Sequence, residues 1–195
     1  MGRGLFMANI MTVDPNHAAQ VLAEADCLHP TQAVDTALDR MAQAINQRLA
    51  GQNPLVLCVL SGGIVAAGHL LTRLDFPLEL DYLHATRYRG QLSGADTLHW
   101  LARPRTPLKD RVVLVVDDIL DEGHTLAGIL QDCREQGAQA VYCAVLVRKL
   151  HDRCVPGLQA DFIGLEVADR YVFGYGMDYK EYLRNAPGIY AVKEH

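Results

Sequence analysis

The sequence predicts an α/β domain in which helices flank a central, mainly parallel sheet, with a small second lobe attached. Short runs that are apolar on both faces alternate along the chain with segments of helical periodicity. Several of these runs end in glycine-rich or acidic turns, as the strands of βαβ units do. At 195 residues, of which 50% are apolar and 21% charged, the chain has the size and composition of one globular domain.

The first part of the chain predicts helices. A short helix is expected around His17–Ala25, within a weakly patterned stretch. From Thr31, apolar residues recur at spacings of three and four: Val34, Leu38, Met41, Ile45 and Leu49. This spacing places them on one helix face. We expect Thr31 to cap this helix and Gly51 to end it.

The middle of the chain alternates between the two types of element. Leu55–Leu60 is apolar throughout and predicts a central strand, and Ile64–Leu74 is compatible with a helix. Leu78–Leu83 predicts another strand. Arg87–Ala95 is rich in Gly, Arg and Ser and predicts a long exposed loop, from which a strand over Thr97–Leu101 returns.

The strongest strand signal is Arg111–Val116. It leads through acidic residues to a predicted helix from about Thr125 to Gln136, which Gly137 stops. Ala140–Val147 predicts the next buried strand.

Beyond Pro156 the pattern changes to short strand-like pieces, Phe162–Leu165 and Tyr171–Phe173, among many aromatic residues. We therefore expect one domain over residues 1–195, with a core of about 31–155. The remaining residues, about 1–30 and 156–195, would form a small hood lobe.

Composition narrows the class of protein. Lys and Arg total 18 against 23 Asp and Glu, a net charge of −5, which argues against a nucleic-acid partner. The five cysteines form no Cys-x-x-Cys pair, as expected of reduced thiols in the cytoplasm. No segment resembles a signal peptide or approaches the ~20 apolar residues of a membrane helix. We expect a cytoplasmic protein with no membrane partner.

The chemistry is concentrated where the strongest strand ends. Asp117, Asp118, Asp121 and Glu122 are followed by a glycine and a threonine at a helix start. Free N–H groups at such a start suit a phosphate, and carboxylates there suit sugar hydroxyls, Mg²⁺ or proton abstraction. The simpler interpretation is a polar helix cap with solvated acids. A second loop, Ser61-Gly62-Gly63, would by itself be an ordinary turn.

Val112–Leu126 resembles the phosphoribosyl pyrophosphate signature of the type I phosphoribosyltransferases: four apolar residues, two acids, two apolar residues and Asp-x-Gly-x-Thr. Further positions resemble the hypoxanthine-guanine branch of that family. They are Leu60-Ser61-Gly62, Arg87-Tyr88, Lys149, Asp161–Glu166, Tyr171–Tyr179 and Arg184. The resemblance covers roughly residues 20–190. It implies the type I phosphoribosyltransferase fold and transfer of the phosphoribosyl group to a 6-oxopurine.

The resemblance also implies roles around the phosphoribosyl group. Asp121 would be the general base at purine N7, while Asp117 and Asp118 would hold the ribose hydroxyls directly or through Mg²⁺. Residues Glu122, Gly123, His124 and Thr125 would cradle the 5′-phosphate. The loop of Leu60, Ser61 and Gly62 would bind pyrophosphate with the help of Arg184.

For the base, the resemblance implies that Lys149 donates to purine O6, Tyr171 stacks on the ring and Val172 contacts it through the backbone. Asp178 would bind a second Mg²⁺, and Arg87-Tyr88 would open a flap that closes over the site. The family also implies a homo-oligomer, a dimer or a tetramer.

The sequence departs from the family at four of these positions. Glu122 replaces a threonine of the signature, and His124 replaces a lysine or arginine. Arg87 stands in place of a small serine, and Tyr171 in place of the commoner phenylalanine. Neither the proposed base nor the proposed metal ligands are lost.

Three other interpretations stay open. A regulator could bind phosphoribosyl pyrophosphate without turnover. A phospho-acceptor receiver domain also ends a strand in Asp-Asp, although on an earlier strand. A related transferase could prefer xanthine, or adenine, although Lys149 argues against adenine because adenine lacks the O6 acceptor.

Overall fold

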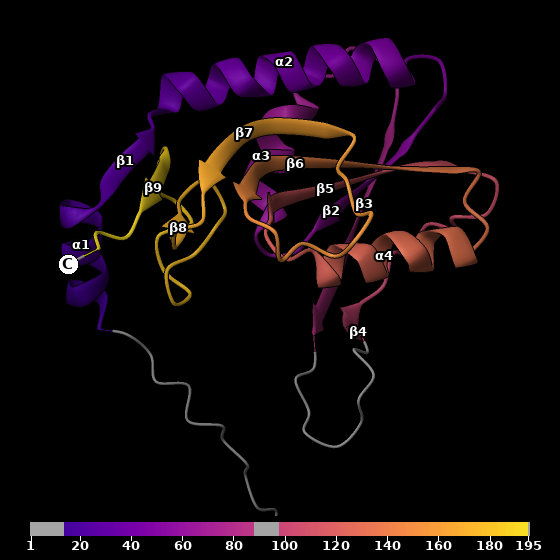
Figure 1. The fold of residues 1–195 in the computed structure, drawn as a ribbon. Helices are drawn as coiled ribbons and strands as arrows, with labels where there is room; N and C mark the ends of the chain where they lie inside the picture. Colours follow the sequence, from indigo (N-terminus) through magenta and orange to yellow (C-terminus); the bar gives the residue numbers. More distant parts are fainter. Residues whose placement is uncertain (1–13, 88–97, 195) are drawn as a thin grey trace, which may run out of the picture.

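The computed structural model describes residues 14–87 and 98–194, and its main element is a six-stranded sheet (Figure 1). The strand order is β4-β3-β2-β5-β6-β7, and all neighbouring pairs are parallel except β3–β4. The strands are β2 (Leu55–Val59), β3 (Glu79–Arg87), β4 (Leu98–Ala102), β5 (Val112–Leu120), β6 (Ala140–Leu150) and β7 (Phe162–Ala168). The predicted fold class is confirmed.

Helices cover both faces of this sheet (Figure 1). α2 (Thr31–Leu49) and α3 (Gly63–Leu71) lie on one face, and α4 (His124–Glu135) lies on the other. Alternate residues of each strand serve the two faces: Val56 and Leu114 join the α2–α3 side, whereas Leu57 and Val115 join the α4 side. The five apolar residues predicted for the face of α2 are all buried.

A three-stranded antiparallel sheet forms the hood, in the order β1-β9-β8. Its strands are β1 (Asp26–His29), β8 (Val172–Phe173) and β9 (Ile189–Ala191), and α1 (Pro15–Glu24) lies beside them. Phe173 is fully buried in the hood core and stacks on Tyr190, with ring centroids 5.7 Å apart. β7 follows residue 156 but pairs with β6, so dividing the chain at that residue does not separate the two sheets.

Several local expectations differ from the structure. Thr31 does not cap α2: the capping position is Pro30, and the Thr31 hydroxyl instead donates to the carbonyl of Pro187 in the hood. β3, β5 and β6 run three or four residues beyond the predicted strand ends. These extensions carry polar residues that local hydrophobicity cannot assign to a strand. Sheet pairing holds them there, of β3 with β4, of β5 with β6 and of β6 with β7.

All five cysteines have free thiols. Within residues 14–87 and 98–194, no helix has the length and apolar character needed to cross a membrane.

Candidate active site

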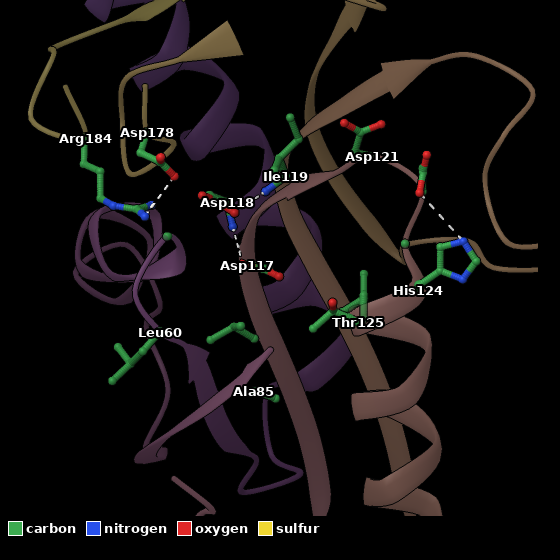
Figure 2. Close-up of a pocket in the computed structure, with 15 residues that line it drawn as sticks. Leu60, Ala85, Asp117, Asp118, Ile119, Asp121, His124, Thr125, Asp178 and Arg184 are labelled. Carbon is green, nitrogen blue, oxygen red and sulfur yellow. Dashed lines mark hydrogen bonds and ion pairs between the residues drawn. The ribbon is translucent and has the colours of Figure 1, made fainter. Parts of the chain in front are cut away.

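The site lies at the carboxyl ends of β2, β5 and β6, where parallel α/β sheets bind ligands (Figure 2). A cleft of about 620 Å³ opens there. Its lining residues include Leu60, Gly62, Ala85, Asp117, Asp118, Ile119, Asp121, Glu122, Gly123, His124, Thr125, Asp178 and Arg184. The cleft therefore brings most of the predicted site together from three separate parts of the sequence.

The floor of the cleft is acidic. Asp117 accepts a hydrogen bond from the backbone N–H of Asp118 at 2.9 Å, and Asp118 accepts one from the N–H of Ile119 at 2.8 Å. Burial, followed by the neighbouring charge of Asp118, raises the pKa of Asp117 well above its ordinary value. Burial also raises the pKa of Asp118, although the charge of Arg184 counteracts this. Two desolvated carboxylates side by side suit a cation or the hydroxyls of a sugar.

Glycine allows the loop after β2 to touch this acidic floor. A Cβ on Gly62 would lie 2.0 Å from Oδ2 of Asp118, and a Cβ on Gly63 would lie 2.8 Å from the carbonyl oxygen of Val116. Gly176, from the hood, approaches the same loop so closely that a Cβ would lie 2.1 Å from the Gly62 carbonyl oxygen. The contact between core and hood at the site is thus made by backbone.

The next turn forms the N-terminus of α4. Gly123 is its capping residue and has a left-handed φ of 79°, which favours glycine. Glycine has no side chain to satisfy the first N–H groups of the helix, so these groups can bind an anion, and the helix dipole favours a negative charge there. Thr125, two residues after Gly123, also lines the cleft (Figure 2).

The two unusual residues of this turn interact with each other. The Nε2 atom of His124 lies 3.8 Å from Oε2 of Glu122, and Nε of Arg153 lies 4.0 Å from its other oxygen, Oε1. The guanidinium of Arg153 thus partly offsets the carboxylate that the departure at position 122 introduces into a phosphate loop.

Asp121 lies at the mouth of the cleft and receives two donors. Nζ of Lys149 lies 2.6 Å from Oδ2, and Nε2 of His151 lies 2.7 Å from Oδ1. Burial by itself would raise the pKa of Asp121, but the hydrogen bonds from Lys149 and His151 outweigh it and hold this pKa below its ordinary value. The carboxylate is therefore ionised at neutral pH, as a general base must be.

The hood supplies an ion pair on the other side of the cleft. Arg184 lies 2.8 Å from Oδ1 of Asp178 and donates to the carbonyl of Gly176 at 2.8 Å (Figure 2). Asp178 also accepts the backbone N–H of Glu181 at 2.9 Å. The pair aims a carboxylate and a guanidinium at the same end of the cleft.

A smaller pocket of about 210 Å³ adjoins the cleft beside Asp121. It is lined by Asp118, Ile119, Asp121, Lys149, Tyr171, Val172, Met177 and Asp178. Tyr171 is 51% exposed, so its ring face is available, and Val172 is buried in β8. A hydrogen-bonding lysine beside an exposed aromatic ring suits a flat, polar heterocycle.

Sequence reasoning missed some residues and misplaced others. His151, Ile119, Ala85 and Met177 were not predicted, yet each borders the cleft or the smaller pocket or contacts Asp121. Ser61 was predicted, but it is exposed and does not line the cleft, although its neighbours do. Arg87 ends β3, and Tyr88, which follows, lies outside the described residues.

Two groups of residues with metal-ligating side chains lie at the site. Asp117, Asp118 and Asp178 line the cleft. Asp121, His151 and Asp169 place ligand atoms within 4.8 Å of one another, and among the described residues they are the one group of three that comes so close. Lys149 and Arg153 already form ion pairs with the two carboxylates of this second group, which disfavours a cation there.

Comparison with known proteins gives one family. Residues 24–181 match the family model of the phosphoribosyl transferase domain. The hypoxanthine-guanine phosphoribosyltransferase of Streptococcus pneumoniae is 30% identical over 161 residues, covering 83% of this chain and 89% of that protein. The enzyme of the same name from Pan troglodytes is 29% identical over 189 residues, covering 92% of this chain and 85% of that protein.

Solved structures agree on the fold. A hypoxanthine phosphoribosyltransferase from Staphylococcus aureus superposes with a TM-score of 0.83 at 22% identity, covering 88% of this chain and 94% of that one. Together with the acidic floor, the helix N-terminus and the smaller pocket, these matches assign the chain. It belongs to the phosphoribosyltransferase family, in the hypoxanthine-guanine branch.

Proposed function

We propose that this protein is a purine-salvage enzyme that transfers the phosphoribosyl group of phosphoribosyl pyrophosphate to hypoxanthine or guanine, forming IMP or GMP and pyrophosphate. One observation carries the proposal. Asp121 stands between an anion-binding helix N-terminus and a pocket that holds Lys149 and Tyr171. A general base at this position would contact the purine on one side and the ribose phosphate on the other.

The phosphoribosyl half of the site uses backbone and acids. The N–H groups at the start of α4 would bind the 5′-phosphate, and Asp117 and Asp118 would hold the ribose hydroxyls. The loop of Leu60, Ser61 and Gly62 would offer N–H groups to pyrophosphate, with Arg184 as the neighbouring cation. A flap opened by Arg87 and Tyr88 would exclude water from C1′ of the sugar.

The purine half selects a 6-oxopurine. Lys149 would donate to O6, Tyr171 would stack on the ring and Val172 would contact it through its backbone. N9 attacks C1′ as pyrophosphate leaves, and Asp121 accepts the N7 proton as positive charge grows on the base.

The donor set of the cleft fits Mg²⁺. This cation prefers oxygen ligands, and Asp117 and Asp118 are adjacent carboxylates whose pKa is raised by burial, so a bound cation would favour their ionised form. Asp117 and Asp118 would hold one ion, and Asp178 a second. When bound, Mg²⁺ offsets the charge of the pyrophosphate leaving group.

Metal removal tests this assignment. Chelation with EDTA should abolish turnover, and added Mg²⁺ should restore it, because the acidic floor otherwise repels the pyrophosphate. Turnover measured spectrophotometrically before and after chelation checks this. Full activity in excess chelator would remove the metal roles of all three residues.

We further propose that the enzyme acts in the cytoplasm as a homo-oligomer, a dimer or a tetramer. Five free thiols support a reducing compartment. Sedimentation of the purified protein measures the oligomeric state directly.

The test of the function is an assay with phosphoribosyl pyrophosphate, Mg²⁺ and one base at a time. Hypoxanthine or guanine should be converted, and adenine should not, because adenine offers Lys149 no acceptor at C6. Conversion of xanthine in preference to both would favour the xanthine transferase. Binding of phosphoribosyl pyrophosphate without conversion of any base would instead indicate the regulator.

A further inference from the structure

A second buried residue holds Asp121 besides Lys149. His151 directly follows the last residue of β6, two positions beyond Lys149, and both side chains reach the carboxylate of Asp121. The His151 side chain is only 4% exposed, and its Nε2 lies 2.7 Å from Oδ1 of Asp121. The Lys149 amine lies on the other carboxylate oxygen, at 2.6 Å.

The backbone fixes the proton arrangement of this imidazole. The N–H of Arg153 donates to Nδ1 of His151 at 3.1 Å, so Nδ1 must be an acceptor in this arrangement. In the neutral ring the proton then resides on Nε2, which is the atom that faces Asp121. His151 therefore donates to Oδ1 without needing a charge of its own.

The two donors differ in what the purine requires of them. Under the proposed function Lys149 donates to O6 of the base, and its amine would have to leave Oδ2 of Asp121 to reach that position. This departure frees Oδ2 for the N7 proton. Only the His151 hydrogen bond then fixes the orientation of the carboxylate.

We propose that His151 is a positioning residue that keeps Asp121 oriented toward purine N7 while Lys149 binds O6. The inference rests on the proposed function, because it assumes that Asp121 is the base. His151 acts through Asp121 and touches neither substrate. Its hydrogen bond to Asp121 would stay in place while the Lys149 amine moves from Asp121 to O6. Freeing Asp121 to accept the N7 proton would therefore depend on a 6-oxo group in the purine.

The surroundings of His151 support a hydrogen-bonding role. Asp121 faces it from the turn after β5, Lys149 from β6 and Asp169 from the segment after β7. Arg153 engages Asp169 at 2.8 Å, so the nearby negative charge of Asp169 is already paired. Asp121 is likewise paired by Lys149.

The experiment compares His151→Phe, which removes the donor at similar volume, with His151→Gln, which retains an N–H donor that does not titrate. His151→Phe should lower kcat by about 10-fold or more, the scale of one hydrogen bond to a charged group. The KM for phosphoribosyl pyrophosphate should stay within about twofold, because the phosphate loop is untouched. His151→Gln should recover most of kcat.

The pH profile gives a readout that a merely structural role would not move. Loss of the donor should shift the acidic limb of kcat to higher pH, since His151 helps to hold the pKa of Asp121 low. His99→Phe, on an exposed position of β4, is the matched control and should behave as wild type. Thermal melting of each variant verifies folding.

The outcomes separate this inference from the function beneath it. A wild-type kcat and acidic limb in His151→Phe would overturn the positioning role, as would a His151→Gln variant as defective as His151→Phe. Asp121→Asn is measured in parallel. Should Asp121→Asn itself remain fully active, the assignment of Asp121 as general base in the proposed function is wrong, whatever the result for His151.

Discussion

Asp121 combines two properties that a general base in a cleft needs. It is 40% exposed and so reaches the ligand space, and yet two donors orient it. Its lowered pKa also contributes to stability. That contribution is present above the pKa of the unfolded chain and is lost as the pH falls through the lower folded value.

Replacing Asp121 by Asn tests the base directly. Asparagine keeps the shape but cannot accept a proton, so kcat should fall by about 10²-fold to 10⁴-fold. The fold should persist, because asparagine keeps the size of the side chain and an oxygen that can accept a hydrogen bond from one of the two donors. Steady-state kinetics and thermal melting check the two parts. Near-wild-type kcat in this variant would contradict the assignment.

Asp117 shows the opposite titration behaviour. Its folded pKa is raised, so the native state binds its proton more tightly than the unfolded chain does. Stability is then lost as the pH rises from the unfolded pKa through the raised folded value. The ionised Asp117 side chain therefore lowers the stability of the folded protein, and binding of a cation to it would reduce this loss.

Asp117→Asn should therefore melt at a higher temperature than wild type near pH 8, by about 2–4 °C for each kcal/mol recovered. The difference should shrink toward pH 4, where the wild-type carboxyl is protonated. Activity should fall at the same time, because the ribose and Mg²⁺ lose a ligand. Melting curves across this pH range check it, and an equal or lower melting temperature at pH 8 would refute it.

At this scale the sequence identified the acids and missed their partners. Asp117, Asp118 and Asp121 follow a strand and precede a glycine, a pattern visible without coordinates. Lys149 was predicted, but its contact with Asp121 was not, because the sequence of one strand does not determine its distance from a residue near another strand. His151 was missed for the same reason, since it lies just beyond β6 and no strand pattern includes it.

Among the elements, the loop after β2 offers a clear contrast with the helix that follows it. A Cβ at Gly62 would collide with the carboxylate of Asp118 at 2.0 Å, whereas a Cβ at Gly68, inside α3, would meet nothing within 4 Å. The two glycines lie six positions apart with opposite environments. They form a matched pair for mutation.

Gly62→Ala should abolish most activity by displacing Asp118 or the loop. Gly68→Ala should retain activity and stabilise the protein by about 0.5–1 kcal/mol, since alanine favours a helix interior over glycine. Kinetics and denaturant unfolding of both variants give the comparison. Equal activities of the two variants would show that the loop does not need the close approach to Asp118.

Element types were predictable and element ends were not. The apolar runs and the helical spacing in α2 reflect burial, which local sequence records well. Strand ends such as Asp117–Leu120 in β5 are set by pairing with β6, a contact between residues about thirty positions apart. Thr31 carried an ordinary capping signal, yet Pro30 took that position and the hydroxyl turned to the hood.

The whole molecule divides its chemistry between two sheets. The six-stranded sheet carries the acids and the phosphate turn, and the hood carries Tyr171, Val172, Asp178 and Arg184. The sequence predicted a hood from the change in composition. It could not predict the order β1-β9-β8, in which the strand nearest the C-terminus lies between two others.

Phe173→Ala tests the independence of the hood. Phe173 is fully buried there, so its loss should destabilise the protein by about 3–5 kcal/mol. The KM for the purine should rise more than the KM for phosphoribosyl pyrophosphate, because β8 carries the base contacts. Ile129→Ala, at a buried position of α4 in the other half, is the control for general destabilisation. Equal changes in both KM values would contradict a separate role for the hood.

The pairing of β1 with β9 also bears on how the protein acquires its activity during folding. Asp26 pairs with Ala191, so this sheet joins residues more than 160 positions apart, whereas β5, α4 and β6 are consecutive neighbours. Closing so long a loop delays native contacts, and local βα units form sooner. We therefore expect a refolding chain to gain affinity for the ribose phosphate before it gains affinity for the purine, so that the order of assembly is built into the topology.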